Sequence, residues 1–147
     1  MSVPKPYYDD GKGIVIYHCD SRQIIRELPD VDLVLTDPPY GIALEYASCL
    51  DNYEQVNEWA TIIEICRLKA KVVSLTPGNL NQYSYLKPTW TLCWFNRAGA
   101  GSGPWGFSCW QPIMCYGPDP YLAEGKGRRP DFIEWSESSE PNGHPCP

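Results

Sequence analysis

The stretch that decides the fold is VDLVLTDPPYGI, residues 31–42. Its first six residues are apolar at nearly every position, which is typical of a strand that is covered on both faces of a parallel sheet. An aspartate, two prolines and a tyrosine follow directly at positions 37–40. Because each proline fixes its own φ and pushes the preceding residue toward an extended conformation, we expect a rigid turn at the carboxyl end of this strand.

Strands and helices alternate on both sides of this stretch. Upstream, GIVIY (residues 13–17) predicts a strand, and a helix follows it with Ser21 as the N-cap and Pro29 as the stop signal. Downstream, the apolar spacing predicts further elements in this order: a helix over 54–71, a buried strand over 71–76, a short helix over 79–86, and strands over 89–96 and 107–117. The alternation predicts an α/β fold with a mostly parallel sheet flanked by helices, built from two successive strand–helix–strand units.

Length and composition are those of one ordinary globular domain. The 147 residues are 43% hydrophobic and 20% charged, which is enough for a single core. After Tyr116 the sequence becomes rich in proline, glycine, serine and glutamate, and only DFIEW (residues 131–135) is strand-like. We therefore predict an α/β unit over residues 1–116 and a loop-rich segment over residues 117–147.

Targeting and cysteine patterns indicate neither a membrane nor an oxidising compartment. The sequence contains no apolar run of about eighteen residues and no signal-like start, so we expect a cytoplasmic protein. Its seven cysteines are odd in number and include no CxxC pair. This pattern predicts neither a disulfide framework nor a zinc site, and we expect no bound metal.

The charge balance argues weakly against a surface that binds a polyanion everywhere. The net charge is −6, whereas nucleic-acid affinity comes largely from lysine and arginine side chains that neutralise phosphates. The basic cluster GKGRRP contains Lys126, Arg128 and Arg129 among glycines and a proline. It is either a solvated loop or a local contact for phosphates.

The turn at positions 37–40 has the chemistry of an amine-binding corner. Prolines lack an N–H group, so the Asp37 carboxylate and the neighbouring carbonyl oxygens form a surface of acceptors alone. In an open α/β sheet, ligands bind at the carboxyl ends of the strands. An exocyclic amine such as adenine N6 donates two hydrogens from one atom and would suit this corner, while Tyr40 offers a flat face on which an unstacked base could rest.

These residues resemble the amino-methylating DNA methyltransferases, the N6-adenine and N4-cytosine enzymes that use S-adenosylmethionine. The similarity runs through three segments, which are IVIYHCDSRQIIRELPDVDLVLTDPPYGI (14–42), FSCWQPIMCYG (107–117) and NGHPCP (142–147). The last segment is similar to the start of a histidine–proline motif, HPxxKP. The resemblance implies a partial Rossmann-like fold of S-adenosylmethionine-dependent methyltransferases, with double-stranded DNA as partner and a flipped adenine as target. An aspartate rather than a serine at position 37 favours adenine over cytosine.

The resemblance also implies a role for each matching residue. Asp37 and the Pro38 carbonyl would bind the target amine, Pro39 would stiffen the turn, and Tyr40 would stack on the flipped base. Asp37 would also border the methyl donor.

Two further residues match positions that contact the cofactor in the family. Asp20 lies where relatives contact the adenosyl ring of S-adenosylmethionine, although an acid at a strand end can equally cap the following helix. The family usually has a glycine directly before that aspartate, where this chain has Cys19. His144, followed by Pro145, matches the histidine–proline motif and is the third expected cofactor contact.

The order of the motifs is that of the class whose glycine-rich cofactor motif lies downstream of both the catalytic and the histidine–proline motifs. The chain is therefore expected to stop inside a motif, and an isolated chain to associate, for example as a homodimer, through an incomplete sheet. GSGPWG (residues 101–106) matches GxGxxG literally, but no helix is predicted directly after it, so we expect a loop.

Three alternatives stay open beside the adenine enzyme. The chain could belong to an N4-cytosine DNA methyltransferase or to an RNA guanine-N2 methyltransferase. Motif order argues against the RNA enzymes, which place the glycine-rich motif before the catalytic one. The third alternative is an inactive fragment that only binds nucleic acid or a partner.

Overall fold

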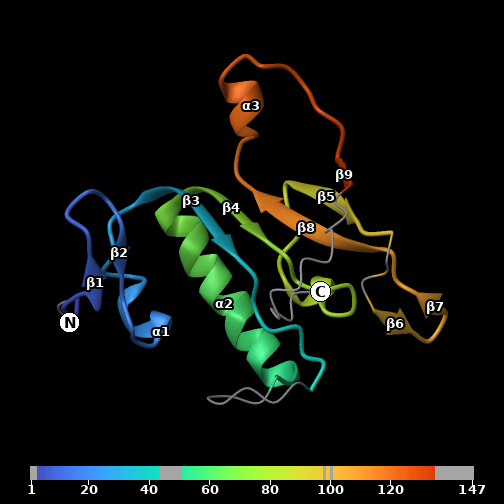
Figure 1. Cartoon of the computed structure of the whole chain (residues 1–147), viewed down its shortest axis with the longest axis horizontal. Helices are drawn as coiled ribbons and strands as arrows, with labels where there is room; N and C mark the ends of the chain where they lie inside the picture. The colour runs from blue at the N-terminus through green and yellow to red at the C-terminus, as the bar shows by residue number, and fades with distance from the viewer. Residues whose placement is uncertain (1–2, 44–50, 98, 100, 135–147) are drawn as a thin grey trace.

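The computed structural model describes residues 3–43, 51–97, 99 and 101–134. Its main feature is a five-stranded sheet with the strand order β3-β4-β8-β5-β9 (Figure 1). The strands are β3 (Val31–Thr36), β4 (Ala70–Leu75), β8 (Trp110–Tyr116), β5 (Trp90–Phe95) and β9 (Phe132–Glu134). The α/β class is confirmed, as are the predicted strands that correspond to β3, β4, β5, β8 and β9.

The sheet is mixed, which differs from the mostly parallel sheet that we predicted. β3 pairs with β4, and β5 with β9, in parallel, whereas β8 runs antiparallel to both β4 and β5. The reason lies in the segment between β5 and β8, which holds the short hairpin of β6 (Ser102–Gly103) and β7 (Gly106–Phe107). Parallel neighbours need a long crossover, usually a helix, whereas a hairpin connection joins antiparallel strands. GSGPWG is not followed by a helix, as predicted, but it forms this hairpin where we expected a loop.

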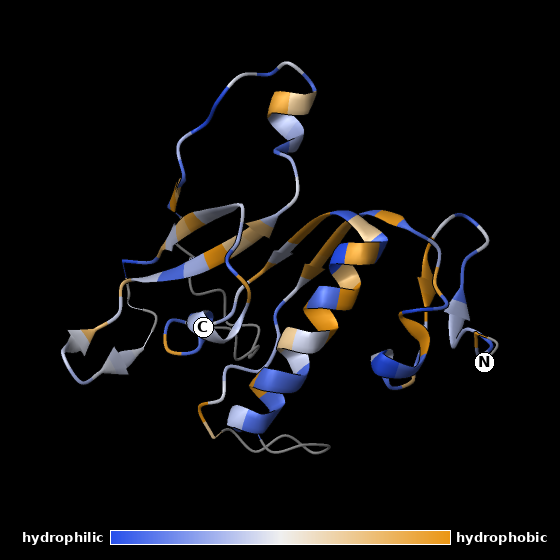
Figure 2. Ribbon diagram, turned by 180° about the vertical axis from the view of Figure 1, so that it is seen from behind, coloured by the Kyte–Doolittle hydropathy of each residue, from blue (hydrophilic) through white to orange (hydrophobic). Residues whose placement is uncertain are grey.

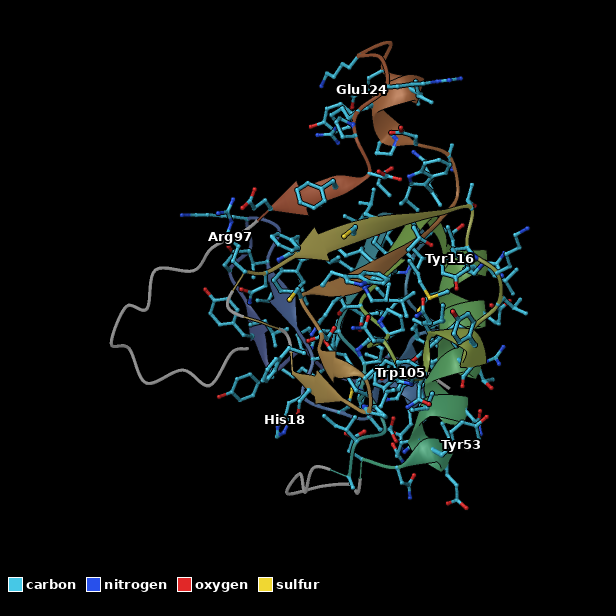
Figure 3. The ribbon with its side chains drawn as sticks, turned by 90° about the vertical axis from the view of Figure 1, so that its right-hand side faces the viewer. His18, Tyr53, Arg97, Trp105, Tyr116 and Glu124 are labelled. Carbon is cyan, nitrogen blue, oxygen red and sulfur yellow. The ribbon has the colours of Figure 1, made fainter. Side chains whose placement is uncertain are left out.

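Helix α2 (Tyr53–Lys69) corresponds to the helix predicted over 54–71, and it forms the crossover between the parallel strands β3 and β4. Asn52 caps its first turn by accepting a hydrogen bond from the backbone N–H of Gln55. One face of α2 packs on the sheet. The buried core comprises Val56, Ile62, Ile63, Cys66, Val73, Leu75, Tyr85, Met114 and Tyr116. Tyr116 lies beside this helix (Figure 3).

The opposite face of β3 is uncovered, so our prediction of a strand buried on both faces is wrong for the described residues. Alternate residues of a strand point to opposite faces. Val34 packs against the core, whereas Leu33 is 53% and Leu35 74% exposed. Figure 2 shows apolar residues on β3 and β4 behind α2, which lies along one side of the sheet.

The segment before β3 also differs from the prediction. Strand β2 (Val15–Ile16) forms where a strand was predicted, but it pairs antiparallel with β1 (Tyr8–Asp9) in a separate two-stranded sheet. The Asp10 carboxylate stabilises this hairpin by accepting hydrogen bonds from backbone N–H groups, and the bond from Ile14 is the main reason why the pKa of Asp10 is lowered. The first strand of the first predicted strand–helix–strand unit is therefore not part of the main sheet, because this local hairpin pairs it instead, whereas the second strand of that unit is β3.

The remaining elements are short. Helix α1 (Ser21–Ile24) begins after Asp20, which is the N-cap in place of the predicted Ser21. The helix predicted over 79–86 is one 3-10 turn, η1 (Gln82–Ser84), and α3 (Pro120–Ala123) follows β8. Within the described part of the chain, no helix is both long and apolar enough to cross a membrane.

Candidate active site

The residues that follow β3 and β4 meet at one edge of the sheet. Thr36 pairs with Leu75, and Leu75 pairs with Met114 of β8, whose earlier residues extend beyond the end of β4 because the two strands are antiparallel. Asp37 and Thr76, one residue beyond their strands, therefore lie at the same edge as Gln111. We call Asp37, Tyr40, Thr76 and Gln111 the Asp37 site.

Asp37 accepts two hydrogen bonds on one oxygen. The Tyr40 hydroxyl donates to Asp37 Oδ1 over 2.7 Å, and the Thr76 hydroxyl donates to the same oxygen. Within the described residues, no donor contacts Asp37 Oδ2, and the residue is exposed. One carboxylate oxygen is thus held by the protein, while the other can accept a hydrogen bond from a ligand.

The Tyr40 side chain is half-buried and is held at several points. Its hydroxyl oxygen lies 3.3 Å from Oε1 of Gln111, a residue that is only 9% exposed. Its backbone carbonyl accepts a hydrogen bond of 2.6 Å from Asn81 Nδ2. Gly78, at φ +69°, packs against the ring so closely that a Cβ there would lie 3.1 Å from Tyr40 Cγ. The position of the ring is therefore set by the loop that follows β4.

The two prolines of the turn pack against the rest of the protein. Pro38 is buried and Pro39 is half-buried, so the turn is packed against the protein. Within the described residues, the Pro38 carbonyl accepts no hydrogen bond. Both acceptors that the sequence predicts for an amine, Asp37 Oδ2 and the Pro38 oxygen, thus have no donor in the part of the chain that the structure describes.

A buried carboxylate that we did not predict supports the end of this turn. Asp51, fully buried at 0% exposure, accepts hydrogen bonds from the backbone N–H groups of Gly41 (2.5 Å) and Ile42 (3.1 Å). It precedes the N-cap of α2. The sequence shows an acid before a helix, but it carries no signal that this acid binds a turn about ten residues upstream.

Thr76, Gln111 and Asn81 were also not predicted as site residues. A signal existed for Thr76, because it is the last residue of one predicted buried strand, while Asp37 directly follows another. The position of Gln111 depends on β8 running antiparallel to β4, which the alternation of elements did not predict.

Asp20 is held by a neighbouring arginine. Its carboxylate caps α1 and binds Arg22, whose Nε lies 2.9 Å from both oxygens and whose Nη2 lies 2.6 Å from Oδ2. The hydrogen bonds from the Arg22 side chain are the main cause that lowers the pKa of Asp20. Arg22 also binds Glu58 of α2 over 2.8 Å. The helix-capping interpretation of Asp20 is therefore confirmed, and no contact in the structure joins it to Asp37.

The remaining predicted positions follow Tyr116 in the sequence. His144 and Pro145 lie outside the described residues. Because β8 is antiparallel to β4, the segment after Tyr116 leaves from the opposite edge of the sheet, where Figure 1 shows α3. There, the Arg129 guanidinium lies 3.1 Å from the centre of the Tyr121 ring, and Lys126 forms an ion pair with Glu124.

The fold and this site describe an α/β protein with a carboxylate, two hydroxyls and an amide gathered where neighbouring strands end. No family model matches the chain. Over 58 residues it is 36% identical to the Type II methyltransferase M.ScaI from Streptomyces caespitosus, and the match covers 38% of the chain and 19% of that protein. The match supports a relationship to methyltransferases.

Proposed function

We propose that the chain is the catalytic segment of an S-adenosylmethionine-dependent DNA methyltransferase that modifies an exocyclic amine, with adenine N6 as the preferred target. The observation that carries this proposal is the Asp37 site, where a carboxylate oxygen that has no donor among the described residues lies beside a fixed tyrosine ring. The partial similarity to a Type II methyltransferase supports the same reaction class.

The site suits an aromatic amine for a specific chemical reason. The lone pair of such an amine is delocalised into the ring, which makes the nitrogen a poor nucleophile. If one hydrogen is donated to Asp37 Oδ2 and the other to the Pro38 oxygen, the nitrogen is favoured in a pyramidal geometry with an available lone pair. After the new N–C bond forms, the Asp37 carboxylate is a nearby acceptor for the proton that the nitrogen loses.

S-adenosylmethionine, when bound, would supply the electrophilic methyl group. Of its three expected contacts, only Asp37 belongs to the Asp37 site. Asp20 does not fit the role in its present state, because both of its oxygens bind Arg22. We therefore assign the Asp37 site to binding of the target amine.

An exposed aromatic hairpin suggests how DNA would contact the chain despite its net charge of −6. Phe95, at the end of β5, pairs with Trp110 at the start of β8, so the β6–β7 hairpin leaves from the same edge as Asp37. Trp105 is fully exposed in its turn, and Phe107 is 85% exposed (Figure 3). The segment that joins the hairpin to β8 is held by Asn79 of the loop after β4, whose Nδ2 donates to the Ser108 hydroxyl and to the Trp110 carbonyl oxygen, the latter over 2.7 Å. Aromatic side chains of this kind stack on bases independently of charge.

Methyl transfer from labelled S-adenosylmethionine to DNA, followed by nucleoside analysis, tests the proposal. We expect N6-methyladenine as product, and Asp37→Ala should lower the rate about a hundredfold or more. Asp32→Ala is the matched control, because Asp32 lies on the strand that precedes Asp37 and, among the described residues, makes only an exposed ion pair with Lys71. N4-methylcytosine as product would replace adenine by cytosine as the target. Full activity of Asp37→Ala, or neither DNA binding nor methylation by the chain, would contradict the proposal.

A further inference from the structure

Thr76 connects the two strand ends that form the Asp37 site. Its backbone N–H donates to the Thr36 carbonyl over 3.3 Å, which continues the β3–β4 pairing beyond the last paired residues. This contact brings the Thr76 side chain next to Asp37, whose Oδ1 accepts the threonine hydroxyl. The contact therefore follows from the register of the two parallel strands.

The two hydroxyl donors select one carboxylate oxygen. Tyr40 and Thr76 both donate to Asp37 Oδ1, while Oδ2 has no donor among the described residues. An exposed carboxylate that lacked such partners would rotate freely and exchange its hydrogen bonds with water. With Oδ1 held from two sides, the direction of Oδ2 is set before a ligand arrives.

We propose that Thr76 is a positioning residue that orients Asp37 Oδ2 toward the amine of the target base. This inference rests on the proposed function and adds a residue to it. The loop that begins with Thr76 also supplies Gly78, which contacts the Tyr40 ring, and Asn81, which binds the Tyr40 carbonyl. One short loop thus sets both the acceptor for the amine and the ring on which the base stacks.

Two substitutions separate the hydroxyl from the shape of the side chain. Thr76→Val keeps the branched shape and removes the hydroxyl, whereas Thr76→Ser keeps the hydroxyl. The first measurement is the set of three-bond couplings about the Asp37 Cα–Cβ bond, obtained by NMR on the 147-residue chain without a ligand. We expect a single rotamer in the parent protein and in Thr76→Ser, and averaged couplings in Thr76→Val.

The second measurement is the preference for an amine. Its probes are two oligonucleotide duplexes that differ only at one unpaired base, which is adenine in one and purine, lacking the amine, in the other. We expect the parent protein and Thr76→Ser to bind the adenine duplex roughly tenfold more tightly, as one charge-assisted hydrogen bond would allow. Thr76→Val should lose most of this ratio while binding the purine duplex as before.

Each result decides the inference. A single Asp37 rotamer in Thr76→Val would overturn the positioning role, and so would averaged couplings with an unchanged preference for adenine. If the parent protein binds both duplexes equally, the proposed function is contradicted, and the amine-directed role of Thr76 is overturned with it. In that case the couplings still report whether the contact between Thr76 and Asp37 exists, so the two failures are distinguishable.

Discussion

Replacing Gly78 by alanine should disturb the Asp37 site through the Tyr40 ring. Gly78 has φ +69°, a conformation that costs a residue with a Cβ about 1–2 kcal/mol. The new Cβ would also lie 3.1 Å from Tyr40 Cγ and 3.3 Å from Cβ and Cδ1 of the same residue. Ordinary van der Waals contacts begin near 3.4 Å, so the ring must move by a few tenths of an ångström.

Gly125→Ala provides a matched control for the backbone cost alone. Gly125 has φ +71°, and no atom lies within 4 Å of the position that its Cβ would occupy. Urea unfolding should therefore show a loss of about 1–2 kcal/mol for Gly125→Ala and a larger loss for Gly78→Ala. Only Gly78→Ala should also weaken binding to the duplex with an unpaired adenine. Equal losses of stability for the two variants, with adenine binding unchanged in both, would refute the packing of Tyr40 on Gly78.

Three further substitutions test the surroundings of the Asp37 site. Asp51→Ala should lower the free energy of unfolding by about 2–3 kcal/mol, because it leaves the N–H groups of Gly41 and Ile42 without their buried acceptor, and urea unfolding would measure this loss. Burial raises the pKa of Tyr85 to about 12, and the hydroxyl has no hydrogen-bond partner in the described structure. In the unfolded chain, the Tyr85 hydroxyl loses its proton near pH 10. The stability that the neutral hydroxyl contributes is therefore present below that pH and is lost as the pH rises toward 12. Tyr85→Phe should leave the stability at pH 7 nearly unchanged and should reduce the loss of stability at alkaline pH. Leu35→Glu, on the uncovered face of β3, should lower any self-association seen by sedimentation without lowering the unfolding midpoint of the monomer, whereas unchanged association would exclude this face as the contact.

The sequence predicted those elements whose pattern is decided locally. The segment over 31–36 is a nearly continuous apolar run and the long helix before β4 has apolar residues at helical spacing, and the structure contains both elements. The turn after β3 was predictable because two prolines restrict the backbone whatever surrounds them. The hairpin of β1 and β2 shows the limit of such reasoning. GIVIY favours a strand, but its pairing partner was decided by a turn at Asp10 that binds its own backbone.

The contacts of the Asp37 site could be predicted only in part, for a related reason. Asp37 and Tyr40 belong to one short segment, so their chemistry is visible in the sequence. Thr76 directly follows β4 and Gln111 lies in β8, so their approach to Asp37 depends on the strand order β3-β4-β8 and on the antiparallel direction of β8. Neither follows from alternating strands and helices. A residue from another strand can be assigned to the site only once the register is known.

Contacts from two other segments explain how the turn at positions 37–40 is held in place. Asp51, just before α2, binds the backbone that follows Tyr40, while Asn81, after β4, binds the Tyr40 carbonyl. The turn is therefore held from both ends of the α2–β4 unit, and the prolines within it need supply no hydrogen bonds of their own. Among the described residues, the Pro38 oxygen and Asp37 Oδ2 accept no hydrogen bond, so the turn is held in place without using either of the acceptors that the proposed function assigns to the amine.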